Sequence, residues 1–370
     1  MNRSFTVDEN LVEEQLFKTA DELFYISRLA PMVFGRKWNE LNEYEKERFK
    51  KTLKIAIQHK IHDQIKQSSG GIPLLSLVSE ETKKHFSRLD YSISGEEGGK
   101  KITIFMLKSD DGNWRISNVA FGENSLIRYY FGICKNLIDN YSIPYLEAEL
   151  REQEYVVLED FEGNEIGVLP KGWGWKKSDD NKNKPYQIKQ EKGNKYLAAD
   201  DHGESVILAA NVKWNLKKYP YISFKWRGRR IPEGGDERFE DKIDNGAGVY
   251  VFYKRKFGLI PESVKYVWSS TLPIGSTLRL PGIGKPWMII AESGETHLGQ
   301  WRTYAFNAYE AYQKTFGGDP PDTAIGIGVL SDANNLKSHA SADYDDIKAL
   351  KYANTDSGIK HFLKAESISR

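Results

Sequence analysis

Carboxylates in the second half of the chain are the residues best suited to acid–base chemistry. They lie in or beside segments of strand-like composition, and they are Glu292, Asp332, Asp345 and Asp346. A glycosidase needs two such carboxylates at a fixed separation, one of them acting as the acid. Their spacing along the sequence does not fix that separation. We therefore expect a protein without catalytic activity, and a glycan hydrolase stays the alternative.

Two groups of side chains could hold a metal ion. His59 and His62 are three residues apart on a predicted helix, but the sequence places no third ligand near them. Glu159, Asp160 and Asp346 could offer oxygens to a structural Ca²⁺. The sequence favours a solvated helix face for the first group and solvated turns for the second. It predicts no metal and no cofactor.

The tryptophans are distributed unevenly along the chain, and there is a single cysteine. Seven of the nine Trp residues lie beyond residue 170. Trp173 and Trp175 stand next to glycines and could stack on sugar rings, whereas Trp226 and Trp268 lie in apolar segments and are expected in a core. The single cysteine, Cys134, excludes an internal disulfide and a Cys-based zinc site, and its aromatic neighbours predict a buried thiol.

Length and charge limit the architecture and the partners. A chain of 370 residues is expected to form two domains. Its net charge of +1 gives no global attraction to nucleic acid. The sequence contains no run of 18 apolar residues, so it predicts no membrane-spanning helix. The first residues, 1–4, lead into a helical pattern without the apolar core of a signal peptide.

Residues 6–67 have the pattern of amphipathic helices. Thr6 with Glu9, and Asn42 with Glu45, each form the spacing of a capping box. Apolar residues then follow on one face of each helix. They are Val12, Leu16, Ala20 and Leu23 after the first box, and Phe49, Leu53, Ile57, Ile61 and Ile65 after the second.

A β-hairpin and two further helices complete this half. Residues 101–108 and 114–121 favour strands, and the intervening Asp-Asp-Gly-Asn at 110–113 predicts a hairpin turn. Residues 125–140 and 143–154 are expected to be helical. Helices packed on a small curved antiparallel sheet make an α+β domain, which can enclose an apolar cavity between its layers.

Several segments of this half resemble the MlaC (toluene-tolerance) family, and the resemblance covers about residues 20–154. They are residues 35–38 (GRKW), 44–49 (YEKERF), 111–116 (DGNWRI), 122–130 (GENSLIRYY) and 145–150 (YLEAEL). The sequence departs from the family's pattern in a short helical region before Phe24, at residues 122–125 and at Tyr130.

The resemblance implies a periplasmic phospholipid carrier whose signal peptide has been removed. Such carriers pass lipid between an outer-membrane lipid complex and the MCE-domain subunit of an inner-membrane ABC transporter. The acyl chains would lie in the apolar cavity. Its expected lining is drawn from Val33, Phe34, Leu53, Ile57, Phe105, Leu107, Ile116, Val119, Phe121, Ile127 and Tyr130.

The second half has the pattern of a jelly-roll sandwich. Short strand-like runs recur, with a short helix at 308–316, and they favour an antiparallel all-β sandwich. The runs are 206–209, 221–227, 248–253, 264–269, 287–291, 301–307, 325–330 and 340–350. Residues 158–350 also resemble an uncharacterised bacterial family. The segments concerned are 169–173 (LPKGW), 224–227 (FKWR), 266–270 (YVWSS), 316–317 (FG), 331–335 (SDANN) and 344–347 (YDDI).

These patterns predict a lipid-carrier domain at 1–154, a β-sandwich at 155–352 and a polar tail at 353–370. The expected function is transport of phospholipid across the cell envelope, with the sandwich as an accessory or docking domain. The alternative is a cell-envelope protein that binds or hydrolyses carbohydrate through the sandwich.

Overall fold

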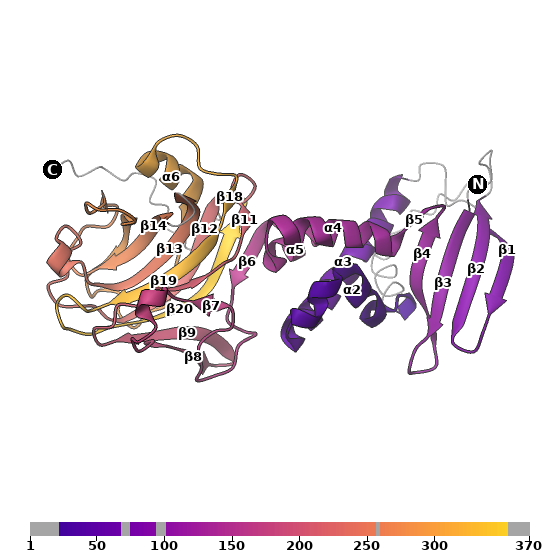
Figure 1. Ribbon diagram of the computed structural model, residues 1–370, viewed down its shortest axis with the longest axis horizontal. Helices are drawn as coiled ribbons and strands as arrows, with labels where there is room; N and C mark the ends of the chain where they lie inside the picture. The colour runs from indigo at the N-terminus through magenta and orange to yellow at the C-terminus, as the bar shows by residue number, and fades with distance from the viewer. Residues whose placement is uncertain (1–21, 68–74, 94–100, 257–259, 354–370) are drawn as a thin grey trace, which may run out of the picture. The chain divides into compact units, whose positions relative to one another are not determined.

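The computed structural model describes residues 22–67, 75–93, 101–256 and 260–353, and their contacts form two units (Figure 1). Unit 1 comprises the residues up to 140 together with 149–152. Unit 2 comprises residues 141–148 and those from 153 onward. The predicted helix that follows Thr6 and most of the polar tail lie outside the described residues.

Helices open unit 1, and its longest helix begins with the predicted capping box. The helices are α2 (Ile26–Phe34), a 3₁₀ turn (Arg36–Glu40) and α3 (Glu43–Gln67). The Asn42 Oδ1 atom accepts from the Glu45 backbone N–H at 2.9 Å, and the Asn42 N–H donates to Glu45 Oε2 at 2.7 Å. Phe49, Leu53 and Ile57 of the predicted apolar stripe are buried.

A five-stranded antiparallel sheet follows, in the order β1-β2-β3-β4-β5. Its strands are β1 (Leu75–Thr82), β2 (Phe86–Ile93), β3 (Lys101–Lys108), β4 (Trp114–Phe121) and β5 (Asn124–Ser125). The predicted hairpin is β3 with β4, paired from Lys108 and Trp114 outward. Its turn closes where the Ser109 N–H donates to the Asn113 carbonyl at 2.9 Å, and Gly112 there has φ 86°.

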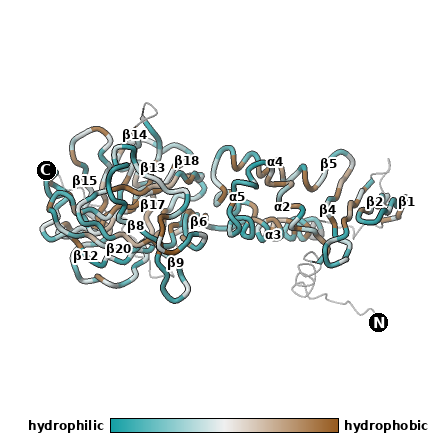
Figure 2. Tube along the Cα trace, turned by 60° about the horizontal axis from the view of Figure 1, so that its bottom comes forward, coloured by the Kyte–Doolittle hydropathy of each residue, from teal (hydrophilic) through white to brown (hydrophobic). Residues whose placement is uncertain are grey.

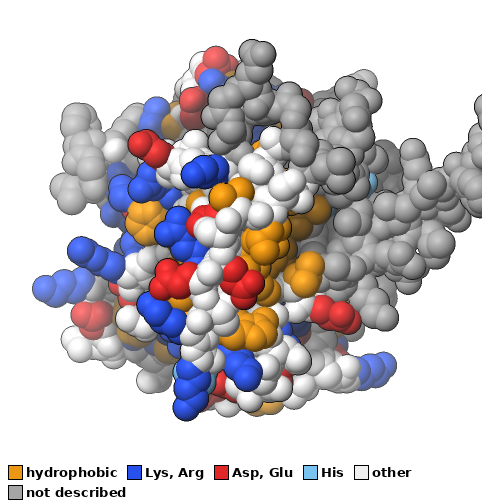
Figure 3. Space-filling view, turned by 90° about the vertical axis from the view of Figure 1, so that its right-hand side faces the viewer, with side chains coloured by type: hydrophobic (Ala, Val, Ile, Leu, Met, Phe, Trp, Pro, Cys, Tyr) orange, Lys and Arg blue, Asp and Glu red, His pale blue; other side chains and the backbone are white. Residues whose placement is uncertain are grey.

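The sequence did not predict β1 and β2. Every described residue of β1 is exposed, so its apolar residues do not alternate with polar ones across a buried face. Leu75, Leu77 and Val78 are among the exposed large apolar side chains. Figure 3 views unit 1 from the β1 side, where hydrophobic side chains gather between charged ones.

Helix α4 (Leu126–Asn140) belongs to unit 1, whereas most of α5 (Ile143–Leu150) belongs to unit 2. The helix predicted at 143–154 is shorter in the structure and ends at Leu150. Glu152 has φ 53° in the turn that follows. Within unit 2, the Tyr145 ring stacks on Tyr141 at 4.2 Å and meets Tyr219 edge-on at 5.8 Å.

Unit 2 contains two large sheets (Figure 1). The seven-stranded sheet has the order β15-β16-β14-β13-β19-β10-β7. Its strands are β15 (Thr277–Leu278), β16 (Trp287–Ser293), β14 (Ile260–Ser269), β13 (Asn245–Lys256), β19 (Gly326–Asp332), β10 (Leu208–Ala210) and β7 (Trp173–Gly174).

The six-stranded sheet has the order β17-β12-β20-β9-β8, and β6 pairs with β20. Its strands are β17 (Arg302–Asn307), β12 (Tyr221–Arg230), β20 (Ala340–Leu350), β9 (Asn194–Asp201), β8 (Tyr186–Glu191) and β6 (Tyr155–Glu159). A small sheet pairs β11 (Trp214–Asn215) with β18 (Thr323–Ala324), and α6 spans Ala308–Phe316 as predicted.

Aromatic side chains from both sheets fill the core of unit 2. Trp226 of β12 lies 5.8 Å from Trp268 of β14, ring centre to ring centre, and both are fully buried, as predicted. Phe224 contacts Tyr266 at 5.9 Å in the same core. Figure 2 shows hydrophobic stretches inside this unit and hydrophilic loops around it. Large ring contacts of this kind stabilise a sandwich beyond the area they bury.

The predicted strands of unit 2 are present, but the direction of one strand pair differs from the prediction and the structure has additional strands. The sheet is not wholly antiparallel, because β14 and β16 run parallel. The hairpin of β8 and β9 was not predicted, although its turn holds Lys192 and Gly193 at φ 53° and 87°. Positive φ at both central residues is the two-residue hairpin geometry, so Gly193 was the overlooked signal. Among the described residues, no helix is long and apolar enough to span a membrane.

Candidate functional site

The candidate site is an apolar cavity in unit 1, between helix α3, the end of β4 and the start of α4. Its volume is about 500 Å³. The lining residues are Phe24, Ile57, Lys60, Ile61, Gln64, Val119, Phe121, Asn124, Ser125, Leu126 and Tyr129. A volume of this size lies within the range of small-molecule sites in proteins.

Local periodicity explains why these apolar residues meet. Ile57 and Ile61 are four residues apart and share one face of α3, while Val119 and Phe121 are two apart and share one face of β4. Leu126 and Tyr129 lie three apart at the start of α4. Three elements thus each present an apolar pair to one space.

Hydrogen bonds fix the start of α4 beside the cavity. Ser125 Oγ accepts from the Arg128 N–H at 3.2 Å, and Asn118 Oδ1 of β4 accepts from the Ile127 N–H at 3.3 Å. Both acceptors satisfy backbone donors of the first helical turn, which has no intrahelical partners. The turn that carries Leu126 and Tyr129 is therefore held against the sheet.

The exposed part of the cavity lining combines apolar surface with one positive charge. Lys60 Nζ lies 5.5 Å from the centre of the Tyr129 ring, and both residues are exposed. Phe121 is 58% exposed and Tyr129 50% exposed, so apolar surface reaches the solvent at this mouth. No Asp or Glu is among the residues that line the described cavity. The site suits an apolar ligand with a neutral or anionic end.

The structure distributes the eleven predicted lining residues over three environments. Those that line the cavity are Ile57, Val119 and Phe121. Those buried in the core but outside the lining are Val33, Phe34, Leu53 and Tyr130. Those half-buried and outside the lining are Phe105, Leu107, Ile116 and Ile127. Their contact with lipid stays a prediction.

The sequence analysis overlooked several lining residues. Ile61 lay in the predicted stripe, one turn after Ile57, and that spacing could have added it to the set. Lys60, Gln64 and Asn124 gave no signal, because polar residues on an exposed helix or turn are common. Phe24 reaches the cavity through its isolated bridge to Ile116 in β4, which only the fold reveals.

The buried groups near the cavity are structural. Cys134 of α4 is fully buried, as predicted, and burial raises the pKa of its thiol to about 12. Burial likewise raises the pKa of Tyr130. Neither group is a nucleophile at neutral pH, because the thiolate and the phenolate are the reactive forms.

The four carboxylates considered for glycan hydrolysis are divided between the two large sheets of unit 2, with Asp332 and Glu292 in the seven-stranded sheet and Asp345 and Asp346 in the six-stranded one. Asp332 of β19 lines a polar cleft of about 440 Å³, and burial raises its pKa. Asp345 and Asp346 lie on β20 in the other sheet, and burial raises the pKa of Asp345 to about 6. Glu292 of β16 accepts hydrogen bonds from Tyr304 and His297.

The groups considered for calcium and for sugar stacking have protein partners. Glu159 accepts from Trp173 Nε1 at 2.8 Å, and Asp346 pairs with Lys225 and Lys348. Two ammonium groups beside Asp346 oppose a cation there. Trp175, 37% exposed, has Lys184 Nζ 4.5 Å above its ring. A calcium ion and a sugar platform both stay untested hypotheses.

Comparison with known families separates the two halves of the chain. Residues 2–152 match the family model described as MlaC protein. Residues 171–348 match the model of a protein of unknown function (DUF3047). Both matches confirm the resemblances inferred from the sequence. The cavity lies wholly within the MlaC-matched region.

Solved structures include a similar chain, and the curated proteins do not. The phospholipid-binding protein from Ralstonia solanacearum, solved in complex with a phospholipid, aligns over 38% of this chain and 80% of its own. The two share 11% sequence identity, with a TM-score of 0.32. No curated protein matches the chain.

Proposed function

We propose that the MlaC-matched region binds the acyl chains of a phospholipid in its apolar cavity and carries the lipid through water. The single observation that carries this proposal is the cavity of about 500 Å³ between α3, β4 and α4, with apolar walls. The family match at residues 2–152 supports it.

The physical requirement is the cost of exposed hydrocarbon. Each CH₂ group moved from water into an apolar environment gains about 0.8 kcal/mol. A carrier therefore needs apolar walls, an open mouth for the head group and no reaction. Exposed Phe121 and Tyr129 extend the apolar walls to the mouth, where Lys60 offers a positive charge.

The wider proposal places this carrier in the periplasm. In it, the protein exchanges lipid with an outer-membrane complex and with the MCE-domain subunit of an inner-membrane ABC transporter. Unit 2 acts as an accessory or docking domain without catalysis. The protein partners of two of the carboxylates considered for glycan hydrolysis support this part of the proposal, because Asp346 pairs with Lys225 and Lys348, and Glu292 accepts hydrogen bonds from Tyr304 and His297.

The test is native mass spectrometry of the full chain purified without detergent, followed by extraction with organic solvent. We expect bound mass in the phospholipid range. Ile61→Trp, which fills the cavity, should lower the bound lipid. Leu137→Trp is the matched control, because Leu137 is half-buried on α4 and outside the cavity lining.

A chain that carries no lipid and takes up none from vesicles would contradict the proposal. Equal loss of lipid in both Trp variants would show that the cavity is not the binding site. A ligand-free protein that binds envelope glycans would instead favour the carbohydrate alternative through unit 2.

A further inference from the structure

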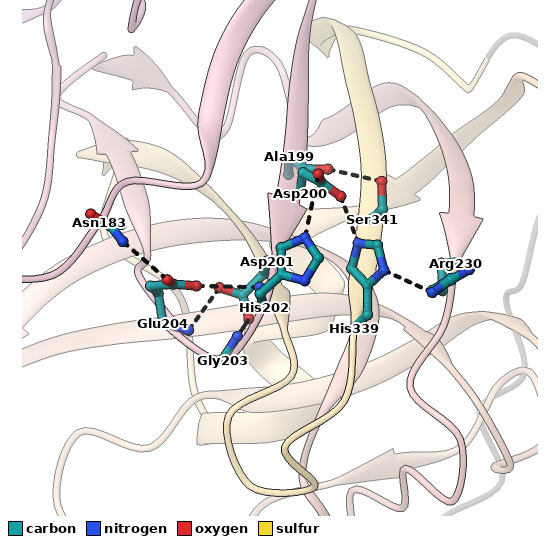
Figure 4. A network of polar contacts seen from close by, with 10 residues as sticks. All are labelled: Asn183, Ala199, Asp200, Asp201, His202, Gly203, Glu204, Arg230, His339 and Ser341. Atoms are coloured by element: carbon teal, nitrogen blue, oxygen red, sulfur yellow. Dashed lines mark hydrogen bonds and ion pairs between the residues drawn. The ribbon is translucent and has the colours of Figure 1, made fainter.

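Two histidines and an aspartate meet at one end of the six-stranded sheet in unit 2. Antiparallel pairing of β9 and β20 sets Asp201 opposite Ala340 and Asp200 opposite Ser341. His202 follows β9 and His339 precedes β20, so the same register places the two histidines side by side (Figure 4).

The donor atoms of these side chains converge. His339 Nε2 lies 2.6 Å from Asp200 Oδ1, and His202 Nε2 lies 3.6 Å from Asp200 Oδ2. The two imidazole rings stack, with centres 4.1 Å apart and planes 20° from parallel. One ligand atom from each of the three residues lies within 4.8 Å of the others. Among the described residues, this is the only group of three such side chains that could hold a metal ion.

Side-chain rotations alone can bring these donor atoms to the separations found around a coordinated metal. A tetrahedral Zn²⁺ site with Zn–N and Zn–O bonds of about 2.1 Å sets its donor atoms about 3.4 Å apart. A metal lies in the plane of each imidazole that binds it, so the stacked rings must turn toward one point and the Asp200 carboxylate must move away from His339 Nε2. Asp200 and His202 are exposed, so their side chains can turn without disturbing the core. Imidazole nitrogen with one carboxylate favours zinc and its transition-metal neighbours over Mg²⁺ or Ca²⁺.

Arg230 determines the proton arrangement of the metal-free site. Its Nη1 atom lies 2.9 Å from His339 Nδ1, and a guanidinium can only donate. Neutral His339 therefore accepts at Nδ1 and carries its proton on Nε2, directed at Asp200. A metal at Nε2 would move that proton to Nδ1, opposite the Arg230 donor. Arg230 is exposed and must turn away, so it competes with the metal.

We propose that Asp200, His202 and His339 form a Zn²⁺ site that clips the end of β9 to the start of β20. Three protein ligands leave one position for water or another ligand. His339 also lines a polar cleft of about 790 Å³ together with Glu233, Ser270 and Glu295. A polar group bound in that cleft is the natural source of a fourth ligand.

The test uses the untagged full chain after treatment with a chelator. Isothermal titration with Zn²⁺ should show one site per chain, Mg²⁺ should give no signal, and Co²⁺ should give the visible absorption of a low-symmetry site. His202→Ala, His339→Ala and Asp200→Asn should each weaken Zn²⁺ binding by about tenfold or more. His85→Ala, an exposed histidine of unit 1, is the control and should bind as the original chain does.

Arg230→Gln should raise the affinity for Zn²⁺, an effect that a purely structural cluster would not show. A glutamine oxygen can accept from His339 Nδ1–H, which orients a metal-bound imidazole. We expect this variant to bind Zn²⁺ more tightly than the original chain. Absence of Zn²⁺ binding, or binding that the ligand substitutions leave unchanged, would overturn the proposal and leave the three residues as an ordinary ion-paired cluster.

Discussion

At the scale of single residues, Lys60 is the charge that stands at the mouth of the cavity. Its ammonium group lies over the Tyr129 ring, and both residues line the cavity. An exposed charge of this kind contributes about 0.2–1 kcal/mol to an interaction, because water and salt screen it. It can therefore tune head-group preference but cannot hold the lipid by itself.

Lys60→Gln should reduce the preference for anionic over zwitterionic phospholipid. The expected change is about two- to fivefold, which corresponds to about 0.4–1 kcal/mol. Competition between vesicles of the two lipid classes, with bound lipid identified by mass spectrometry, measures it. Lys51→Gln is the control, since Lys51 is exposed on α3 but outside the lining. Equal effects in both variants would indicate a general surface charge effect.

A second residue-scale feature is the buried carboxyl group of Glu237 in unit 2. Burial raises its pKa from 4.5 to about 7, against the opposing effects of the Ser269 hydrogen bond and nearby Lys265, while Asp236 adds to the rise. Ser269 Oγ donates to Glu237 Oε2 at 2.6 Å. Near pH 5 the folded chain therefore holds a proton that the unfolded chain releases.

This difference sets the direction of a pH dependence. Because the folded state binds more protons between pH 4.5 and about 7, the free energy of unfolding should fall as pH rises through that window. The slope is at most about 1.4 kcal/mol per pH unit. Glu237→Gln should make the slope shallower in denaturant titrations, and the exposed Glu233→Gln should not. An unchanged slope in Glu237→Gln would assign the dependence to other groups.

At the scale of elements, helix α3 connects the capping box to the cavity. The reciprocal hydrogen bonds of Asn42 and Glu45 start the helix, and the stripe that follows buries Phe49 and Leu53 before Ile57 and Ile61 reach the cavity. Fraying of the first turn would shift the apolar stripe of α3 relative to the residues that it packs against. The cap therefore supports both stability and the wall of the site.

Asn42→Ala should destabilise unit 1 by about 1 kcal/mol, because it leaves a helix N–H without its acceptor. A thermal unfolding transition assigned to unit 1 should shift to lower temperature, with unit 2 unchanged. Asn39→Ala is the control, since Asn39 is exposed in the preceding 3₁₀ turn. A shift of equal size in both variants would argue against the cap as the cause.

At the scale of the whole molecule, α5 joins the two units in sequence while packing with the second. Tyr145 and Leu146 are buried and belong to unit 2, where Ser142 Oγ also donates to the Lys213 carbonyl at 2.7 Å. The boundary predicted between residues 154 and 155 stays a prediction. A fragment that ends at 154 would expose these side chains, each of which gains about 1.5–3 kcal/mol from burial.

The pair Tyr145→Ser and Leu146→Gln should act in opposite directions in two contexts. In the fragment 1–154 it should raise solubility, because it removes exposed apolar surface. In the full chain it should lower the stability of unit 2, because it removes buried contacts. Sedimentation of the fragment and thermal unfolding of the full chain measure the two effects. A fragment that remains insoluble with both substitutions would show that the domain boundary is wrong.

The same fragment tests whether unit 2 affects lipid exchange. We expect residues 1–154 to bind lipid alone but to transfer a fluorescent phospholipid to acceptor vesicles at a rate different from that of the full chain. The substituted, soluble fragment serves in this assay. Equal rates would mean that unit 2 is an anchor or a passenger and does not act on the carrier.

Features that depend on neighbouring residues followed from the sequence. The Asn42 box, the turn before Trp114, the helix at 308–316 and the core positions of Trp226 and Trp268 each arise from local hydrogen bonding or from period and apolarity. The same local patterns separated an α+β half from a β-rich half. Strands exposed on both faces, such as β1, were not predicted, because apolar and polar residues do not alternate along them.

Only the tertiary structure decided which side chains meet. Val119 and Leu53 have the same apolar character in sequence, yet one lines the cavity and the other is fully buried in the core, because their elements face different neighbours. His202 and His339 stand far apart in the chain, and a single register between β9 and β20 brings them together. A shift of one residue in that pairing would separate them, since successive strand residues point to opposite faces.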